Sequence, residues 1–445
     1  MKIIFILNHF LPDTLAGIEL YTFKLAGSLQ AAGAGVAVLI PFFDSEQTDE
    51  YYYEGIRVIR YAENSRSDRD MIMGKTIPQG LAQFKNILEQ ERPDIVHFQE
   101  LAAGRGIGMY HLEAVKSLQI KILLTCHLST YSCQTGNLMY KDEKICDGII
   151  RRSRCTICSY HARGITGIKA GLLAGAAKVL YASGINATGW NATVGTALGF
   201  PFLIDKKKQE LTKIAALCNK IVVLTHWYGQ ILEANAVPAE KIFYCPQGLT
   251  GSAVKYIGTI AKLPLRLAFI GRVSKYKGVH LLLKAFQQLA PDKILLDIYG
   301  PVTEDEYAAG CRQQSAEMPN VHWMGAIASE KVVNILSAYD LLCLPSTFSE
   351  MSPLVIPEAF AAGIPVLASN VYGNAEQIKD GVNGWLFDFK NVPSLKKKLE
   401  TLIAHPELID AAKKNLPAPR PFDTIADEHV DMYRTLLAEK ATEFS

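Results

Sequence analysis

The sequence lacks long hydrophobic runs and a strong excess of either charge. No stretch of about 18 uncharged apolar residues occurs in the 445-residue chain, so we expect no transmembrane helix. The apolar run at residues 3–7 is too short for a signal-peptide core, and no small-residue cleavage site follows it. A formal net charge of +2 gives no broad field for a polyanion, so nucleic acid is not an expected partner. These absences predict a cytoplasmic protein.

A dinucleotide-binding motif and a disulfide framework are also missing. The fingerprint G-x-G-x-x-G does not occur, which argues against an NAD-dependent enzyme. The chain has nine cysteines, and an odd number without an export signal favours free thiols or metal ligands over disulfides.

The sequence does contain short apolar runs that alternate with helix-length amphipathic segments. This alternation is typical of β-α units that build parallel sheets, and the chain is long enough for two large domains. The predicted fold class is therefore α/β, with two doubly wound parallel-sheet domains. We expect strands near residues 2–8, 35–41, 56–60, 94–98, 121–126, 220–224 and 241–245, and again near 265–270, 294–299, 321–324, 341–344 and 366–369.

A stretch of weak periodicity with two glycines, residues 249–263, predicts a linker between the domains. The N-terminal domain is then expected over residues 1–248 and the C-terminal domain over 264–420. Residues 421–445 predict a terminal helix.

The most informative stretch is residues 349–366. Ser352 is a good N-cap residue and Pro353 suits the first helical position, so a helix is expected to begin here. Glu350 would then lie in the loop and Glu358 in the helix. Pro357, about a turn inside, is expected to kink the helix axis.

The two glutamates suit opposite ends of one extended ligand. At about 1.5 Å of rise per residue, Glu358 lies roughly 9 Å along the axis from the cap, too far for both carboxylates to share a proton or a metal. The helix start at Ser352, Pro353 and Leu354 offers unpaired N–H groups to an anion, and a sugar nucleotide fits this description. Two solvated glutamates are the alternative, but the pair follows an apolar strand, where ligands of open α/β sheets bind.

These residues resemble the signature of glycosyltransferase family 4, the retaining group 1 glycosyltransferases of GT-B fold. The resemblance covers residues 265–390 strongly and earlier residues more loosely. It implies two Rossmann-like domains facing a central cleft, with a C-terminal helix crossing back to the N-terminal domain. It also implies that Glu350 faces the donor sugar and that Glu358 holds the nucleotide ribose.

A basic loop, residues 271–278, follows the first strand of the second domain. Arg272 offers a planar fork and Lys277 a mobile point charge, which together suit a diphosphate. A solvated turn is the alternative. In the resembling family this loop binds the donor phosphates, so the resemblance assigns Arg272 and Lys277 to that role and leaves Lys275 as a spare.

Two residues of the first domain complete the resemblance. Gly17 lies between the first strand and a helix, where a glycine lets backbone approach a ligand; a plain turn is the alternative. The family's corresponding loop borders the donor phosphates and the acceptor. His127 directly follows the strand at 121–126 and matches the family histidine that hydrogen-bonds the donor sugar. Leu128 stands where the family often has an acid or amide.

A polar Cys-rich insertion is expected over about residues 128–164. Its four cysteines could hold a tetrahedral structural zinc, although only one C-x2-C pair is present and free thiols or a redox pair are the alternative. Some family members of polysaccharide-assembly type carry a similar insertion. Its basic excess would suit a lipid-pyrophosphate acceptor or phosphate headgroups. The cysteines are Cys133, Cys146, Cys155 and Cys158.

Residues 165–198 contain Lys169 and Lys178 but no acidic residue, and they are rich in Gly, Ala and Leu. A buried helical hairpin is the first interpretation. Docking on a membrane surface is the alternative, which would place the protein peripherally on the inner face of a membrane.

The resemblance predicts a retaining hexosyltransferase that uses a UDP- or GDP-type sugar donor and a glycan or lipid-linked saccharide acceptor. A non-catalytic GT-B partner subunit and a sugar-nucleotide epimerase are the alternatives. No D-x-D motif lies in a suitable place, so no catalytic metal or other cofactor is expected. The predicted catalytic residues are His127, Arg272, Lys277 and Glu350, and the predicted donor-binding residues are Gly17, Ser352, Pro353, Leu354 and Glu358.

Overall fold

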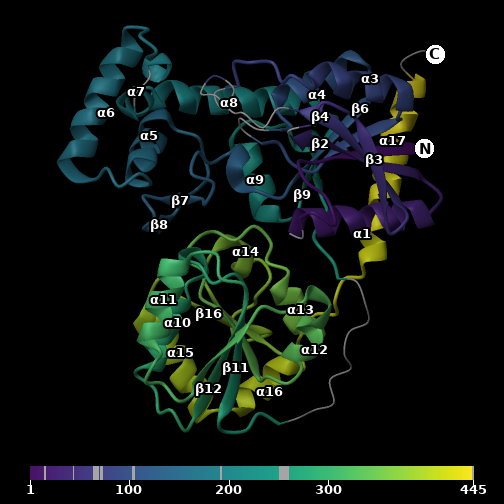
Figure 1. Ribbon diagram of the computed structural model, residues 1–445. Helices are drawn as coiled ribbons and strands as arrows, with labels where there is room; N and C mark the ends of the chain where they lie inside the picture. The colour runs from purple at the N-terminus through teal and green to yellow at the C-terminus, as the bar shows by residue number, and fades with distance from the viewer. Residues whose placement is uncertain are drawn as a thin grey trace. The chain divides into compact units, whose positions relative to one another are not determined.

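The computed structural model describes residues 1–14, 17–43, 45–63, 70, 74–102, 106–190, 193–249 and 260–442, and these divide into two compact units (Figure 1). Unit 1 comprises Met1–Gly136, Asp147–Pro246 and Phe422–Ser445, and unit 2 comprises Asn137–Cys146 and Gln247–Pro421. Most of the predicted linker, residues 249–263, lies outside the described residues. Asn137–Cys146 was expected in the first domain but groups with unit 2.

The described part of unit 1 contains an eight-stranded sheet in the order β10-β9-β6-β5-β1-β2-β4-β3. Neighbouring strands are parallel except β3 and β4, which are antiparallel. The inner strands are nearly continuous apolar runs because helices cover both faces of such a sheet. The strands are β1 (Lys2–Ile6), β2 (Gly35–Phe43), β3 (Asp49–Tyr53), β4 (Ile56–Glu63), β5 (Ile95–Phe98), β6 (Lys121–Cys126), β9 (Lys220–Val223) and β10 (Ile242–Tyr244).

The helices of unit 1 fall into two groups. Most accompany the sheet, and three stand apart from it, joined to it by the long helix α8 (Figure 1). The first group is α1 (Gly17–Ala31), α3 (Leu81–Glu91), α4 (Met109–Ser117), α9 (His226–Ala234) and α17 (Phe422–Thr442); the second is α5 (Arg152–His161), α6 (Gly167–Ala182) and α7 (Thr193–Leu198), with α8 at Phe200–Leu217.

Helices α5 to α8 enclose a small core of their own, formed by Tyr160, Ala170, Ala197 and Phe200. The Tyr160 hydroxyl donates to the Ala197 carbonyl at 3.0 Å. Within α6, however, only Ala170 and Ala177 are buried. The expectation of a buried helical hairpin over residues 165–198 is therefore wrong for α6. Leu173 packs partly against the small core, but Ile168, Leu172 and Val179 of this helix are exposed.

The described part of unit 2 contains a six-stranded sheet in the order β13-β12-β11-β14-β15-β16, parallel throughout. The chain runs outward from β11 in one direction and outward from β14 in the other, so a topological switch point lies between these two strands. This arrangement confirms the predicted fold class. The strands are β11 (Leu265–Ile270), β12 (Ile294–Tyr299), β13 (Val321–Gly325), β14 (Leu341–Leu344), β15 (Val366–Ser369) and β16 (Gly384–Phe387).

Alternate residues of β11 serve two different cores of unit 2. Leu267 and Phe269 pack with α10 (Val279–Phe286), α11 (Asp305–Gln314), α15 (Val392–Ala404) and α16 (Glu407–Lys413). Ala268 and Ile270 pack on the other face, with α12 (Val332–Leu336) and α13 (Val355–Ala361). This is the period-two alternation of a strand buried on both sides.

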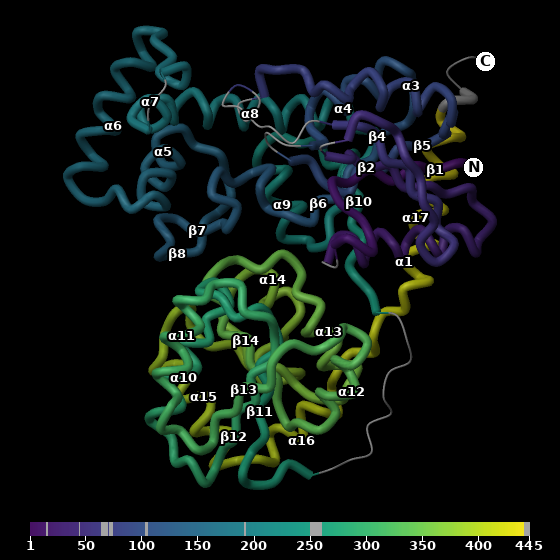
Figure 2. Tube along the Cα trace, in the orientation of Figure 1, coloured from purple at the N-terminus to yellow at the C-terminus, as the bar shows by residue number. Residues whose placement is uncertain are grey.

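The C-terminal helix α17 belongs to the core of unit 1. It lies beside α1 and the N-terminal strands in both views (Figures 1 and 2). Its buried face includes Ile425 and Tyr433. The Tyr433 hydroxyl is 2.7 Å from Nδ1 of His97 in β5, and His97 Nε2 is 2.7 Å from the Thr125 hydroxyl in β6. A buried polar chain thus ties the last helix to two central strands.

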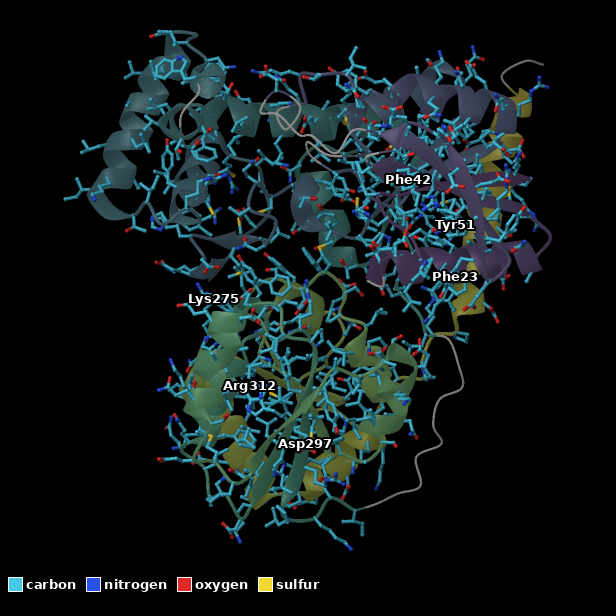
Figure 3. All side chains as sticks on the ribbon, in the orientation of Figure 1. Phe23, Phe42, Tyr51, Lys275, Asp297 and Arg312 are labelled. Atoms are coloured by element: carbon cyan, nitrogen blue, oxygen red, sulfur yellow. The ribbon has the colours of Figure 1, made fainter. Side chains whose placement is uncertain are left out.

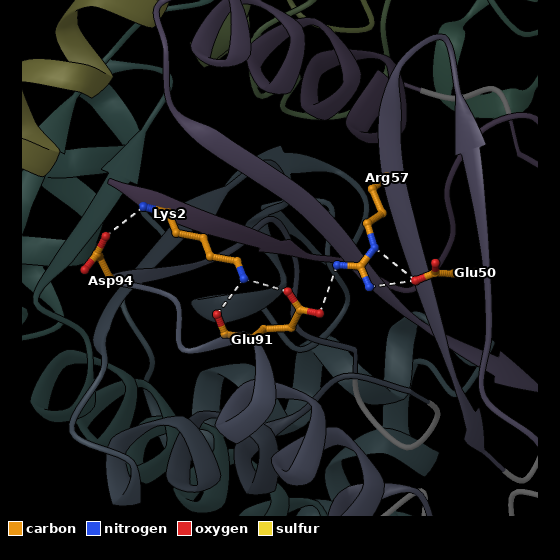
Figure 4. Close-up of polar contacts among 5 residues, drawn as sticks. All are labelled: Lys2, Glu50, Arg57, Glu91 and Asp94. Carbon is orange, nitrogen blue, oxygen red and sulfur yellow. Dashed lines mark hydrogen bonds and ion pairs between the residues drawn. The ribbon is translucent and has the colours of Figure 1, made fainter.

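A network of charges closes the amino end of the same sheet (Figure 4). Glu91, at the end of α3, accepts from Lys2 at 2.7 Å and from Arg57 at 2.9 Å. Arg57 also pairs with Glu50 on β3 at 2.7 Å. Burial by itself would raise the pKa of Glu91, but the bonds from Lys2 and Arg57 lower it. The network joins β1, β3, β4 and α3 at the edge opposite the strand ends that precede Gly17 and His127, so its role is structural.

Candidate functional site

The candidate site of unit 2 lies where β11 and β14 end, at the switch point of the sheet. The loop after β11 carries Lys277 and the loop after β14 carries Glu350. Lys277 Nζ lies 2.7 Å from Glu350 Oε1, and the Ser346 hydroxyl donates to the same oxygen at 2.6 Å. The Lys277 and Glu350 side chains are 17% and 7% exposed. The structure therefore brings two predicted catalytic residues together as a largely buried ion pair.

The two loops are held against each other by backbone contacts. Gly278 has φ of +74°, and a Cβ at this position would clash with the Pro345 carbonyl oxygen. The Thr347 amide donates to the Tyr276 carbonyl at 2.7 Å, and the Thr347 hydroxyl donates to the Lys275 carbonyl at 2.9 Å. Only glycine meets both demands, a left-handed backbone and a close approach. The separation of Lys277 and Glu350 is thus fixed by the main chain.

A third loop, after β15, packs on the loop that carries Glu350. Gly373, at the start of helix α14 (Tyr372–Ala375), lies so close that a Cβ would clash with the Glu350 carbonyl oxygen. The Ser369 hydroxyl donates to the Ser346 carbonyl at 2.8 Å, and Asn374 Nδ2 donates to the Ser369 carbonyl at 3.0 Å. These contacts hold the backbone of the loop that carries Ser346 and Glu350.

The remaining predicted residues of unit 2 are placed less tightly. Arg272 is exposed, two residues after the end of β11, and Glu358 is half-buried in the first turn of α13. Lys275 lies at the same end of the unit, whereas Asp297 lies in β12, further into the sheet (Figure 3). Lys275 Nζ is 3.6 Å from the Asp142 carboxylate.

The predicted start of the helix after Glu350 is wrong by two residues. Helix α13 begins at Val355, with Leu354 rather than Ser352 as the flanking residue. Pro357 consequently falls in the first turn, where a backbone N–H has no helical partner, so the expected cause of a kink is absent. Ser352 and Pro353 lie in the loop before the helix, and their donor-binding role stays a prediction.

A hairpin that sequence reasoning missed packs on the Ser349–Glu350 loop. It consists of the antiparallel strands β7 (Met139–Tyr140) and β8 (Lys144–Ile145). The Ser349 amide donates to the Asn137 carbonyl at 3.2 Å, and its hydroxyl donates to the Leu138 carbonyl at 3.4 Å. Leu138 and Met139 are buried. An apolar pair inside a polar insertion was the one signal for this contact.

The same hairpin also reaches the basic loop. Lys390 Nζ donates to the Asp142 carbonyl oxygen, and the Asp142 carboxylate faces Lys275. The hairpin segment therefore contacts both loops that carry the Lys277–Glu350 pair, through Ser349 in one loop and through Lys275 in the other.

The candidate residues of unit 1 lie at the carboxyl edge of its sheet. His127 follows β6 and is 9% exposed, and its Nε2 is 3.0 Å from Gln99 Oε1, after β5. The edge of the Tyr21 ring packs on the imidazole at a centroid distance of 4.9 Å. Burial, with a smaller contribution from His429, lowers the pKa of His127 to about 3. Gly17 is the exposed first residue of α1.

The environment of His127 defines its chemistry at neutral pH. A pKa near 3 keeps the ring neutral. Because an amide oxygen can only accept, Nε2 carries the proton and donates it to Gln99, which leaves the lone pair of Nδ1 as an acceptor. The ring is therefore suited to position a hydroxyl group, and it does not supply a positive charge.

A pocket of about 320 Å³ opens at the same edge of unit 1. Its lining mixes apolar side chains of α4 and α8 with charged groups, among them Glu100, Lys206 and Lys207. Lys207 Nζ donates to the Thr130 carbonyl at 2.7 Å, and burial lowers its pKa. Such a mixture of apolar surface and fixed polar groups is typical of small-ligand sites.

The four cysteines of the insertion divide between the two units. Cys146 belongs to unit 2, and the other three belong to unit 1. All nine cysteines are free thiols. Burial, the largest effect, raises the pKa of Cys155. Within the described ranges, no group of three or more His, Cys, Asp or Glu side chains is arranged to hold a metal ion. A structural zinc on Cys133, Cys146, Cys155 and Cys158 stays a prediction.

Two family models match the chain. The model for glycosyl transferases group 1 matches residues 258–417, and the model for glycosyltransferase family 4 matches residues 15–166. Among similar proteins, spore coat protein SA of Bacillus subtilis is 28% identical over 148 residues, 31% of this chain and 39% of the relative. Alpha-maltose-1-phosphate synthase of Mycolicibacterium smegmatis is 27% identical over 219 residues, 46% of this chain and 56% of the relative. The chain thus spans about half the length of these relatives.

Solved structures of the same architecture match over nearly their whole length. Sucrose-phosphate synthase from Thermosynechococcus elongatus has a TM-score of 0.64 at 18% identity, covering 98% of this chain and 99% of that one. Anabaena HepE, in complex with UDP and glucose, has a TM-score of 0.59 at 16% identity and full coverage of both chains. The structural likeness establishes the shared GT-B fold, and at such low identities it establishes the fold alone. With both family models matching, the chain belongs to the group 1 glycosyltransferases of family 4.

Proposed function

We propose that the protein is a retaining glycosyltransferase that moves a hexosyl group from a nucleotide-diphosphate sugar to a glycan or lipid-linked saccharide. The observation that carries the proposal is the Lys277–Glu350 pair at the switch point of the unit 2 sheet. The HepE structure of the same fold, solved with UDP and glucose, supports a UDP-sugar as the first donor to test.

The basic loop would bind the diphosphate of the donor. Lys277 keeps two N–H groups beyond the one it gives to Glu350, and exposed Arg272 adds a planar fork. Both cations stabilise the negative charge that grows on the diphosphate as the sugar leaves. Glu350, held by Ser346, keeps its second oxygen for a sugar hydroxyl. Glu358 would hold the ribose.

In a retaining transfer, the acceptor hydroxyl attacks the anomeric carbon on the face that the diphosphate leaves. The bond from the anomeric carbon to the phosphate oxygen breaks, the bond to the acceptor oxygen forms, and the departing phosphate oxygen takes the hydroxyl proton. Neutral His127 would orient the sugar through Nδ1. The 320 Å³ pocket of unit 1 is the proposed acceptor site, since it offers apolar surface together with Glu100 and Lys207.

Calorimetric titration with a panel of UDP-, GDP- and ADP-sugars tests the donor, with NAD⁺ as the control ligand. We expect one sugar nucleotide to bind in the micromolar range and to transfer its sugar with unchanged anomeric configuration, read by NMR of the product. Transfer is expected to persist in EDTA. Failure of every sugar nucleotide to bind would exclude the proposal. Binding without transfer to any acceptor favours the partner subunit, and a changed sugar without acceptor favours the epimerase.

A further inference from the structure

An apolar stripe runs along the outward face of α6 in unit 1. Ile168, Leu172 and Val179 are 82%, 72% and 65% exposed. At about 100° per residue, these three side chains point within roughly 40° of one another. Exposed residues of this size that share one direction are unusual on a soluble protein and mark an interaction surface.

Loose packing of α6 does not explain why these side chains are exposed. The opposite face of α6 is seated through Ala170 and Ala177, and Ala170 belongs to the small core with Tyr160 and Phe200. Further large apolar side chains are exposed after α6, namely Ile185 at 47% and Trp190 at 46% in the connection to α7, and Val194 at 60% in α7.

The charges around the stripe favour an anionic partner. Lys169 and Lys178 lie about 80 to 100° from the centre of the stripe, one on each side. Residues 163–204 contain no aspartate or glutamate, so no carboxylate in this segment repels an anionic surface. Lysines that flank an apolar face can extend their amines to phosphate headgroups while their stems cover apolar surface.

We propose that the α6 stripe docks the protein on the surface of an anionic phospholipid bilayer. At about 1.5 Å per residue, the 16-residue helix is roughly 24 Å long and would lie in the plane of the interface, with Ile168, Leu172 and Val179 among the acyl chains. Among the helices in the described ranges, none has the length and apolar content needed to cross a membrane. The proposed docking surface belongs to unit 1, whereas Lys277 belongs to unit 2, so the proposal does not rest on the donor site.

Flotation with vesicles tests the proposal, using phosphatidylcholine alone or mixed with phosphatidylglycerol. We expect the full chain to float with the mixed vesicles and much less with the neutral ones. In Ile168→Asn/Leu172→Asn, the partition coefficient should fall at least tenfold, because each buried aliphatic side chain contributes about one order of magnitude or more. Lys169→Gln/Lys178→Gln should lower it several-fold on anionic vesicles only, and added salt should reduce that difference.

Leu408→Asn in unit 2, where the wild-type side chain is 38% exposed, serves as the matched control and should float like the wild type. The stripe variants should keep the wild-type melting temperature and sugar-nucleotide affinity, because their side chains contact solvent. Equal flotation of the stripe variant and the wild type would overturn the proposal. So would flotation that needs no anionic lipid, or binding of the stripe to a protein partner without any vesicle affinity.

Discussion

Lys277 and Glu350 form a largely buried ion pair, so each charge compensates for the burial of the other. Removing the amine leaves a carboxylate that is 7% exposed with Ser346 as its hydrogen-bond donor. The cost to folding is moderated because the lysine end of the pair is 17% exposed. Under the proposed function the cost to catalysis is larger, because removing the amine also removes its contact with the charge that develops on the donor.

Lys277→Ala should therefore reduce turnover by about 10²- to 10³-fold. The free energy of unfolding should fall by about 3 kcal/mol or less, the lower end of the range for breaking a buried ion pair. Lys275→Ala is the matched control, since this lysine lies in the same loop with its side chain 65% exposed. Turnover of purified protein and urea unfolding check both. A Lys277→Ala enzyme that loses stability but keeps its turnover would show that the pair serves the fold alone.

Buried histidines make the stability of unit 1 depend on pH. Burial lowers the pKa values of His111 and His127 to about 3, and lowers that of His97 well below its usual value of 6.5. Between about pH 3 and 6.5 the unfolded chain binds more protons than the folded one, so stability falls as the pH falls. The stability that neutral histidines contribute is fully present only above pH 6.5.

We expect the urea midpoint to drop steadily from pH 7 to pH 5, with each such histidine contributing about 1 kcal/mol per pH unit. His111→Gln should make this dependence shallower, because it removes one of the three groups. His405→Gln should leave it unchanged, because His405 has a side chain that is 60% exposed. A midpoint that is flat over this range would contradict the neutral state of these rings.

Sequence reasoning located Lys277 and Glu350 because each follows a strand, and parallel strands of one sheet end at the same edge. It could not place the amine on the carboxylate, since that contact depends on β11 and β14 being neighbours. It also could not find Gln99 as the partner of His127. Nothing in the local sequence of Gln99 marks it, and the contact spans 28 residues.

At the scale of single elements, the hairpin β7–β8 is the least expected part of unit 2. It comes from the Cys-rich insertion, yet the carbonyl groups of the two residues before β7 accept hydrogen bonds from the amide and hydroxyl of Ser349. Ser349 immediately precedes Glu350, so the hairpin limits where that carboxylate can point. The zinc prediction concerns the cysteines of this insertion, whereas the residues that contact Ser349 are Asn137 and Leu138.

Replacing Asn137–Cys146 with a short Gly-Ser loop should weaken donor binding about tenfold, because the Glu350 loop then samples several positions. Leu138→Ala/Met139→Ala should have a smaller effect in the same direction, since Met139 is 1% exposed and Leu138 is fully buried. Asp142→Asn, which removes an exposed ion pair with Lys275, should change little. Titration calorimetry measures all three. Wild-type affinity in the loop replacement would refute a positioning role.

Prediction of the elements themselves succeeded where periodicity is strong. Each of the twelve expected strands is present. Most are buried apolar runs of four or more residues, a pattern that is easily recognised in a sequence, whereas β10 is a half-exposed strand of only three residues. Short or half-exposed strands, such as β3 and β16, were missed. Helix α13 was predicted to start too early because Ser352 and Pro353 are good starting residues whose preference is overridden by the packing of the loop before Val355.

For the whole molecule, the placement of α17 has a measurable effect. The helix follows unit 2 in sequence but completes the core of unit 1, where Tyr433 is fully buried and bonded to His97. Tyr433→Ala should therefore cost about 3–5 kcal/mol, confined to unit 1. Trp385→Ala, in the core of unit 2, is the reciprocal control.

Hydrogen exchange with mass spectrometry separates the two outcomes. Peptides from β1, β5 and β6 should lose protection in Tyr433→Ala, whereas peptides from β11 and β14 should not. The pattern should reverse in Trp385→Ala. Loss of protection in both units of the tyrosine variant would mean that the chain unfolds as one cooperative body.

The path of the chain also bears on how such proteins recombine. The backbone passes from one unit to the other at residues 136/137, 146/147, 246/247 and 421/422. A chimera joined at a single crossover near residue 247 would combine the native hairpin with the rest of a foreign unit 2, and would place a foreign last helix in the native core of unit 1. Exchanging unit 2 as an intact folding unit therefore requires four coordinated junctions.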